Sequence, residues 1–529
     1  MAGRNRFSRR IALRTALGLL AARAVPAGAA ANPEVVVSAK PAANARPFDR
    51  AGFGTVGIYD IDWLTQPNFA RLLDNLAASP GAFHGVRCFG VFTAGTLEEL
   101  QPTSGGKVWI DPNTSPDFSI PFAALQALVE RGLTPFLALG FFPPAVSPAP
   151  IAPPPTWDRW KTLVRAFFTA LAADARFGAA IKTWRFEVWN EPDEGRFWSG
   201  TMDDYFALYR ATSEAMTEAG VNVSLGGPAI AYKPEVTPAD GPPWLDAFLR
   251  FVASDPSLRC DFISYHRKGT VTNGQSDPRR LLDAARTAAK QALAIEPIRF
   301  GGTTLINDEA DEKVGFEVPY APRMDERNAA WLAASLAIHQ TLSDGAGSSG
   351  PRFLADADNA DLQLVQAPFD GRRSIMTLAQ PGATTDVLKI PAYNFYELLR
   401  LLDGSPASVV SGGSLLFPHM DLYHLAVAGA DSVSALLTYY PNPDVANPAP
   451  RTLDYALTDL PWPNVNVARF QIDARLSNSY AAAGGSPANP YPVPTPKQLA
   501  AIRQAQELAL ARPIQRDVAL PRGAYRETL

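Results

Sequence analysis

Apolar runs and amphipathic stretches alternate along the chain from about residue 47 to residue 404. Stretches such as "RWKTLVRAFFTALAADA" carry apolar residues at positions i, i+3, i+4 and i+7, which predicts helices. Between them lie eight runs that are apolar at both odd and even positions, as strands covered on both faces are: residues 52–58, 85–91, 134–140, 183–189, 222–227, 261–266, 297–306 and 351–355. Eight such units predict an α/β fold, a (β/α)8 TIM barrel, whose functional side chains follow the carboxyl ends of the strands.

The pattern changes after residue 404. Segments such as "TLDYALTDL" alternate apolar and polar positions and are separated by Gly, Pro, Asn and Asp, which predicts half-exposed antiparallel strands. We therefore predict a β-sandwich domain with a C-terminal tail over residues 405–529. An N-terminal strand within residues 32–46 is predicted to join this sandwich, and the barrel is predicted to occupy residues 47–404.

Residues 1–31 have the features of a signal peptide. A basic start that includes "SRRIALR" is followed by a short Ala/Leu-rich stretch and by small residues, which is typical of a twin-arginine signal. We expect a bacterial protein that is periplasmic or secreted; a disordered basic tail is the alternative. No later segment has the roughly 20 uninterrupted apolar residues of a membrane span.

The charge of the chain limits the partners that it can bind. The formal net charge is −4, and it becomes −10 without the six arginines of residues 1–31. Broad electrostatic attraction to nucleic acid or an anionic membrane is therefore excluded, and an anionic substrate has to be met by a few local Arg and Lys side chains. Two cysteines and five scattered histidines predict no metal site, and the absence of a Gly-rich phosphate loop predicts no nucleotide cofactor.

The stretch "WRFEVWNEPDEG" ends an apolar strand with Asn190 and Glu191, where burial makes a carboxylate costly. Cleavage of a glycosidic bond with retention needs two carboxyl groups about 5–5.5 Å apart. Glu309, in "TTLINDEADEKVGF" after the seventh strand, is the candidate for the second, because strands four and seven face each other across a barrel mouth. The alternatives are a solvated acidic loop, or another acid of the same segment: Asp308, Asp311 or Glu312.

Several motifs, in order and spacing, resemble one known family: "FEVWNEPDEG", "LGGPAIAY", "DFISYHRKGT", "NDEADEKVGF" and "ADNADLQLVQAPFDGRR". The resemblance is to glycoside hydrolase family 39 and, within it, to the α-L-iduronidase branch. It implies a retaining exo-glycosidase that removes a terminal uronic-acid-type sugar from an oligosaccharide or polysaccharide, without a cofactor. A β-xylosidase-like activity on a neutral sugar is the alternative enzyme, and a non-catalytic carbohydrate-binding protein is the alternative of another class. The oligomeric state is not predicted.

The resemblance also implies roles for three residues at the centre of the site. Glu191 would be the general acid/base, Glu309 the nucleophile, and Asn190 the ligand of the sugar 2-hydroxyl. We expect Trp189 and the anionic nucleophile to raise the pKa of Glu191 into the range of a proton donor, while nearby cations keep Glu309 ionised.

The same resemblance places further residues around the sugar: His266, Lys268, Gly315, Phe316, Asp358, Arg372 and Phe89. Arg372 offers a planar fork for a substrate carboxylate, Asp358 and the backbone of Gly315 would hold the same side of the ring, and Lys268 adds a point charge. The sequence departs from the branch at Phe89, where a histidine is usual, and at Phe316, where a tryptophan is usual. Both phenylalanines are predicted to lie in the wall of the cleft.

Overall fold

The computed structural model describes residues 34–41, 47–94, 108–231, 244–271, 276–315, 318–356, 367–382, 386–411, 421–441 and 452–529. The predicted signal peptide and two predicted site residues, Phe316 and Asp358, lie outside the described residues. Among the helices in these ranges, none combines the length and the apolar character that crossing a lipid bilayer requires.

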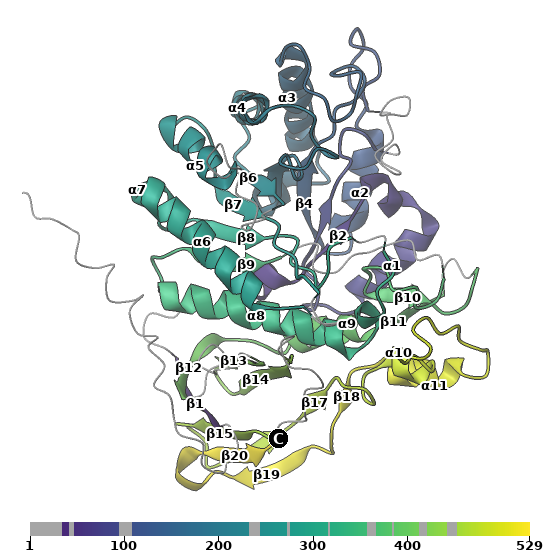
Figure 1. Cartoon of the computed structure of the whole chain (residues 1–529), viewed down its shortest axis with the longest axis vertical. Helices are drawn as coiled ribbons and strands as arrows, with labels where there is room; N and C mark the ends of the chain where they lie inside the picture. Colours follow the sequence, from purple (N-terminus) through teal and green to yellow (C-terminus); the bar gives the residue numbers. More distant parts are fainter. Residues whose placement is uncertain are drawn as a thin grey trace, which may run out of the picture.

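Eight parallel strands form one curved sheet in chain order (Figure 1). They are β2 Thr55–Ile58, β3 Gly85–Cys88, β4 Thr134–Leu139, β5 Arg185–Val188, β6 Ser224–Ile230, β7 Phe262–Tyr265, β8 Thr304–Asn307 and β9 Arg352–Ala355. The first and last strands meet where the Asp356 carboxylate, just after β9, accepts a hydrogen bond from the Thr55 backbone N–H of β2 (3.0 Å). The predicted (β/α)8 barrel is confirmed.

Helices surround this sheet and bury their apolar faces against it. They are α1 Pro67–Ala77, α2 Ser119–Val129, α3 Asp158–Ala173, α4 Met202–Glu218, α5 Trp244–Ser254, α6 Arg279–Ile295, α7 Pro297–Phe300, α8 Glu326–Ala346 and α9 Pro391–Leu399. Short 3-10 helices are η1 Arg50–Phe53, η2 Ile61–Thr65, η4 Gly178–Thr183, η5 Ala321–Met324 and η7 Pro521–Gly523. Each Leu or Phe that a helix buries in this way contributes about 1.5–3 kcal/mol.

The strand predicted over residues 297–306 is wrong in its first half. Pro297 occupies the first turn of α7, where proline is favoured, and the Glu296 side chain caps this turn by accepting a hydrogen bond from the Ile298 N–H (3.2 Å). A proline and a cap therefore override the apolar pattern, and the strand is confined to β8.

A second domain is built on a six-stranded sheet of order β14-β13-β12-β1-β15-β20. Its strands are β1 Glu34–Pro41, β12 Ser405–Ser411, β13 Leu422–Ala428, β14 Val433–Tyr439, β15 Asp454–Thr458 and β20 Tyr525–Thr528. Strand β1 pairs antiparallel with β12 and parallel with β15, so the segment before the barrel contributes a strand to the domain after it. The domain boundaries themselves stay a prediction.

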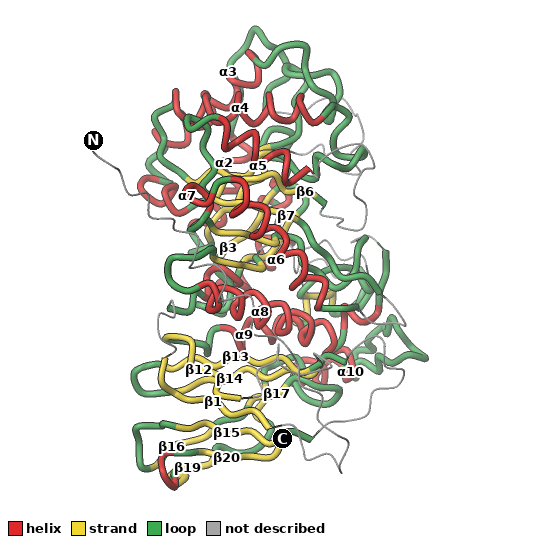
Figure 2. Tube along the Cα trace, turned by 60° about the vertical axis from the view of Figure 1, so that its left-hand side comes forward, coloured by secondary structure: helices red, strands yellow, loops and turns green. Residues whose placement is uncertain are grey.

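Smaller elements complete the structure. They are β10 Met376–Leu378 with β11 Val387–Lys389, β16 Asn464–Val467 with β19 Gln515–Ala519, β17 Phe470–Gln471 with β18 Ala509–Leu510, and the helices α10 Ser479–Ala482 and α11 Leu499–Ala505. Figures 1 and 2 both show α8 and α9 between the barrel and the β domain. Helix α8 is therefore buried on two sides, which explains why its apolar residues follow no single face.

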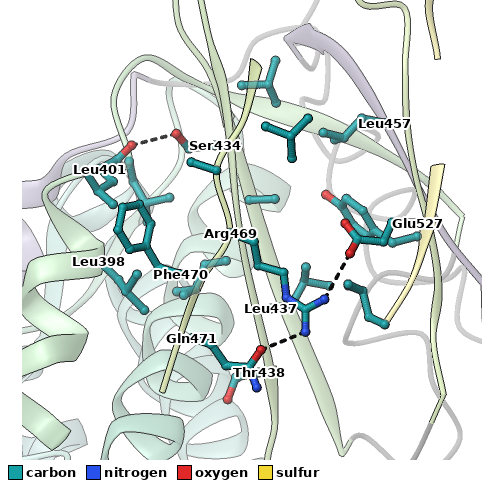
Figure 3. A pocket seen from close by; sticks show the side chains of 18 of the residues that line it. Leu398, Leu401, Ser434, Leu437, Thr438, Leu457, Arg469, Phe470, Gln471 and Glu527 are labelled. Carbon is teal, nitrogen blue, oxygen red and sulfur yellow. Dashed lines mark hydrogen bonds and ion pairs between the residues drawn. The ribbon is translucent and has the colours of Figure 1, made fainter. Parts of the chain in front are cut away.

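A cavity of about 970 Å³ lies between α8, α9 and the β domain (Figure 3). Apolar side chains such as Leu398 and Phe470 line it, and Arg469 crosses one side to donate hydrogen bonds to Glu527 (3.0 Å) and Gln471 (2.8 Å). None of the predicted site residues lines this cavity. The chemistry predicted from the sequence therefore has to be sought at the carboxyl ends of β2 to β9.

Candidate active site

The backbone at the end of β5 is held in an unfavourable conformation. Trp189 (φ 72°) and Glu191 (φ 42°) both lie in the left-handed region, which costs a non-glycine residue on the order of 1–3 kcal/mol. Packing holds them there: the Trp189 indole donates a hydrogen bond to the Phe197 carbonyl (2.9 Å), and its ring lies 4.6 Å from that of Phe142. The Glu191 N–H donates to the Ala229 carbonyl near the end of β6 (2.9 Å). The turn thus has one orientation, with Glu191 directed into the barrel mouth.

Glu309 reaches the same place from the other side of the barrel, two residues after β8. An oxygen of Glu309 and an oxygen of Glu191 lie within 4.8 Å of each other, and both are close to the His266 ring. His266 Nδ1 is 2.9 Å from Glu191 Oε1 and 3.4 Å from Glu309 Oε1. The two carboxyl groups therefore have the close spacing that retaining glycosidases use, rather than the roughly 6.5–9.5 Å of inverting ones.

His266 and Lys268 come from the segment that follows β7. The His266 N–H donates to the Ile230 carbonyl of β6 (2.7 Å), which fixes the start of this segment. Lys268 forms an ion pair with Glu309, and its Nζ lies 3.8 Å from Glu191 Oε1. Burial lowers the pKa of Lys268, but Glu309 and Glu191 outweigh burial and raise it above its ordinary value. Lys268 is therefore a permanent positive charge beside both carboxylates.

Arg87 and Glu187 are functional-site residues that were not predicted. Arg87 is fully buried and donates to Glu187 (2.6 Å), to Glu309 (3.3 Å) and to the Asn190 side-chain oxygen (3.2 Å). Both charges sit inside apolar strands, "GVRC" and "RFEV". A buried charge needs a partner of opposite charge. The presence of one Arg and one Glu in two apolar strands could therefore have indicated from the sequence that Arg87 and Glu187 pair.

Phe89, predicted to lie in the wall of the cleft, supports Arg87 in this structure. Its ring is buried, and the Arg87 guanidinium carbon lies 4.5 Å from the ring centre, which is the geometry of a cation–π contact. The ring of Tyr59 packs beside it at 6.3 Å. A role of Phe89 towards the sugar stays a prediction.

Asp308, next to the candidate nucleophile, lies in the same buried network. Its oxygens are 3.5 Å from Arg87 Nε and 3.5 Å from His266 Nε2. Burial, reinforced by the negative charge of Glu187, raises the pKa of Asp308 well above its ordinary value. Burial and the Glu187 charge therefore favour the protonated form of Asp308.

The electrostatics of the two central glutamates differ in part from the prediction. Burial raises the pKa of Glu309, but His266 and Lys268 outweigh burial and hold it well below its ordinary value. Burial also raises the pKa of Glu191, but Lys268 and the hydrogen bond from His266 hold it below the ordinary value as well. The predicted rise in the pKa of Glu191 is therefore wrong for this geometry, because Lys268 and His266 face both carboxylates.

Arg373, which the sequence analysis did not select, lies beside the candidate nucleophile, whereas the role predicted for Arg372 on the far side of the sugar ring stays a prediction. Arg373 Nη1 is 3.9 Å from Glu309 Oε2 and 3.1 Å from Asp311 Oδ1, and the side chain is buried. The Arg372 side chain is 30% exposed, and its ion pair in the described part of the chain is with Asp370 (3.6 Å). The preceding Gly371 sets this direction, since its φ is 76° and a Cβ there would meet the Tyr320 nitrogen at 2.6 Å.

Gly315, whose backbone was predicted to contact the sugar, lies six residues after Glu309. Its carbonyl accepts a hydrogen bond from Arg323 Nη2 (2.9 Å), and Arg323 also donates to the Lys313 carbonyl (2.8 Å). A guanidinium therefore fixes the backbone of Gly315, and its contact with a sugar stays a prediction.

Among the residues that the structure describes, two groups of side chains bring possible metal donors together: Glu187, His266 and Asp308, and Glu191, His266 and Glu309. Arg87 and Lys268 already pair with these carboxylates. A divalent ion would have to displace both cations or sit beside them, which like-charge repulsion disfavours. These carboxylates are therefore better arranged to pair with Arg87 and Lys268 than to bind a metal ion.

The barrel and the paired carboxyl groups at its mouth define a class of protein, the retaining glycoside hydrolases with two catalytic carboxylates. The chain belongs to the glycosyl hydrolases family 39, whose model matches residues 35–416.

Individual relatives agree with this membership. The chain is 32% identical to the α-L-iduronidase of Homo sapiens over 275 residues, which is 49% of this chain and 40% of that protein. It is 31% identical to the β-xylosidase of Caldicellulosiruptor saccharolyticus over 157 residues, 28% of this chain and 30% of that protein. The chain thus spans less than half the length of these relatives. The solved structure of a bacterial orthologue of human α-L-iduronidase shares the fold, with a TM-score of 0.74, 21% identity, and coverage of 94% of this chain and 81% of that one.

Proposed function

We propose that the protein is a retaining exo-glycosidase that removes a terminal uronic-acid-type sugar, as an α-L-iduronidase does. The observation that carries the proposal is the pair of carboxyl oxygens, from Glu191 and Glu309, within 4.8 Å of each other at the barrel mouth. One pyranose between them would have an acid and a nucleophile on the two sides of its anomeric bond.

We assign the two steps of a double displacement to these two glutamates. Glu309, kept ionised by Lys268, attacks the anomeric carbon while Glu191 gives a proton to the leaving oxygen. A glycosyl ester of Glu309 results. Glu191, now ionised, takes a proton from water, and that water attacks the anomeric carbon and releases the sugar with its original configuration. Asn190, whose side-chain oxygen accepts a hydrogen bond from Arg87, would bind the 2-hydroxyl.

A uronate substrate would help Glu191 to become the acid. Lys268 lowers the pKa of Glu191 from 3.8 Å away. A substrate carboxylate that draws Lys268 towards itself weakens this effect, so the pKa of Glu191 rises when the anionic sugar binds. A neutral pentose leaves Lys268 with the two glutamates. The negative charge of the substrate would therefore help Glu191 to protonate the leaving oxygen of that substrate.

Two observations favour an anionic sugar, and one favours a neutral one. Lys268 and Arg373 both lie within 4.0 Å of the candidate nucleophile and can bind a carboxylate. The similarity to the α-L-iduronidase of Homo sapiens also extends over more residues (275) than the similarity to the β-xylosidase (157). The likeness to a β-xylosidase keeps activity on a neutral pentose as the second candidate.

A panel of 4-methylumbelliferyl glycosides tests the proposal. We expect the α-L-iduronide to be cleaved with a kcat/KM about 10–100-fold above that of the analogue whose carboxylate is reduced to an alcohol, because a charge-assisted contact contributes about 1.5–3 kcal/mol. Faster cleavage of the β-D-xyloside than of the iduronide would favour the second candidate. Binding of these sugars without any turnover would favour a non-catalytic carbohydrate-binding protein.

The two neighbouring arginines give a further prediction. We expect Arg373→Ala to lower kcat/KM for the uronide about 10–100-fold, since it removes a buried guanidinium that lies 3.9 Å from Glu309 and can meet a substrate carboxylate. Arg372→Ala should have a smaller effect, because Arg372 is partly exposed and pairs with Asp370. Steady-state kinetics of both variants, with thermal melting to confirm folding, decide the point. A larger loss in Arg372→Ala would restore the role that the sequence suggested for it.

A further inference from the structure

Glu312 is a buried carboxyl group three residues beyond Glu309, and the proposed mechanism does not use it. Its side chain is 1% exposed. Glu312 Oε1 accepts hydrogen bonds from the hydroxyl groups of Tyr440 (2.7 Å) and Tyr320 (3.3 Å), whereas Oε2 has no hydrogen-bond partner among the described residues. Burying a carboxyl group with one oxygen that lacks a hydrogen bond costs free energy. A functional role would explain why such a group lies in this loop.

Tyr440 comes from the β domain, not from the barrel. It follows β14 directly, and its N–H donates to the Asp421 carbonyl beside β13 (2.8 Å). Burial raises the pKa of Tyr440 well above its ordinary value, so the hydroxyl stays protonated and donates a hydrogen bond to Glu312. The same hydroxyl accepts a hydrogen bond from the Ser276 N–H (3.3 Å). The β domain thus reaches into the barrel loop through one side chain.

Each of the three residues after Glu309 is held by a different element. The Ala310 carbonyl accepts from the Trp331 indole of α8 (2.7 Å). Asp311 binds Arg373 (3.1 Å). Glu312 binds Tyr440, and its carbonyl accepts from the Ser276 hydroxyl. The loop that carries the candidate nucleophile is therefore positioned by tertiary contacts rather than by its own hydrogen bonds.

Tyr440 also supports the neighbouring anchor. Its ring packs edge-on against Trp331, with 5.6 Å between ring centres. Tyr440 therefore supports Glu312 through its hydroxyl group and Trp331, which binds the Ala310 carbonyl, through its ring.

We propose that Glu312 and Tyr440 are a positioning pair through which the β domain fixes the loop that carries the nucleophile, so that turnover depends on the pair although neither side chain touches the reacting atoms. The inference rests on the proposed role of Glu309. It gives the β domain a part in catalysis in addition to its part in folding. The pair acts by keeping Glu309 at attacking distance, where a displacement of about 1 Å can cost about 10²-fold in rate.

The pair also gives the loop a dependence on pH. Burial is the main reason that the pKa of Glu312 is raised to about 7; the Tyr440 hydrogen bond, Arg327 and Arg323 act against burial, and Asp325 acts with it. Tyr320 is the other titratable group in contact. Because the folded state holds the proton more tightly than the unfolded chain, the stabilisation is fully present below the ordinary pKa of a glutamate, near 4.3, and is lost as the pH rises through about 7.

The first test removes one hydroxyl group. Tyr440→Phe is compared with Tyr455→Phe, which removes a buried hydroxyl of the same domain that bonds to His424 (3.2 Å) and not to the barrel loop. We expect Tyr440→Phe to lower kcat at least about tenfold with little change in KM, and Tyr455→Phe to stay within about threefold of wild type. Equal kinetics in the two variants, at equal melting temperature, would overturn the proposal.

A covalent label separates this proposal from the proposed function. The probe is the 2-deoxy-2-fluoro glycosyl fluoride of the sugar that wild type cleaves; a Glu309 oxygen bonds to the anomeric carbon while the C–F bond breaks and fluoride leaves. We expect the label on Glu309 in both proteins, formed at least about tenfold more slowly in Tyr440→Phe. A label on another residue would contradict the proposed function. A label that forms on Glu309 of Tyr440→Phe at the wild-type rate would contradict only the proposal of a positioning pair.

A second variant tests the titration. Glu312→Gln keeps an oxygen to accept from Tyr440 but cannot ionise. We expect the kcat/KM of Glu312→Gln, divided by that of wild type, to rise at least about threefold between pH 5.5 and pH 8, because only wild type gains a buried charge in the loop. A ratio that stays constant across this range would contradict the dependence on Glu312.

Discussion

Glu309→Ala is expected to lower kcat about 10⁴-fold or more, because it removes the proposed nucleophile. The variant leaves a space the size of a carboxyl group next to Lys268, which forms an ion pair with Glu309 in the native protein. Added azide should enter this space, attack from the same side and restore turnover of activated aryl glycosides. Its product is the glycosyl azide of inverted configuration, which proton NMR identifies.

The control for this variant is Glu130→Ala, which removes an exposed carboxylate from the outside of the barrel. It should keep wild-type kinetics. Full activity of Glu309→Ala, or an azide product of retained configuration, would exclude Glu309 as the nucleophile.

Glu191→Ala should divide substrates by their leaving groups. We expect kcat/KM to fall about 10²–10⁴-fold for an oligosaccharide, whose leaving oxygen needs a proton, and by less than about tenfold for a 2,4-dinitrophenyl glycoside, which leaves as a stable anion. The acid/base role also predicts that the alkaline limb of the kcat/KM profile disappears for the dinitrophenyl substrate.

Kinetics of the two substrates across pH 4–9 test the role of Glu191. Equal losses on both substrates, without rescue by azide, would mean that Glu191 acts through the structure of the site and not as the acid/base. The lowered pKa of Glu191 makes this experiment informative, because the free enzyme holds this carboxyl ionised and the acid form has to arise when substrate binds.

The sequence predicted the parts of the site that follow from strand ends. Glu191 and Glu309 come directly after apolar runs. In a parallel barrel the carboxyl ends of all strands lie at one mouth, whatever the conformation of the loops that follow them. It did not predict Arg87, Glu187 and Asp308 as a network, because their partners are fixed by strand neighbours and not by sequence spacing.

The choice between Arg372 and Arg373 shows the limit most clearly. Both residues have the same chemistry, and motif order alone selected Arg372. The left-handed Gly371 and the close Tyr320 backbone decide that Arg373 points to Glu309. Side-chain direction after a turn is set by backbone angles and by neighbours from other elements, neither of which a motif contains.

The sequence by itself determined the barrel, the β domain that follows it, and the two acids at the ends of strands β5 and β8, because hydrophobic periodicity and strand ends are local properties of the chain. Only the tertiary structure decided the direction of the pKa shift of Glu191, the arginines that lie beside Glu309, and the contact of Tyr440 with Glu312. These depend on how charges and hydroxyl groups from distant segments share one buried space, where a few ångströms change both pKa and pairing.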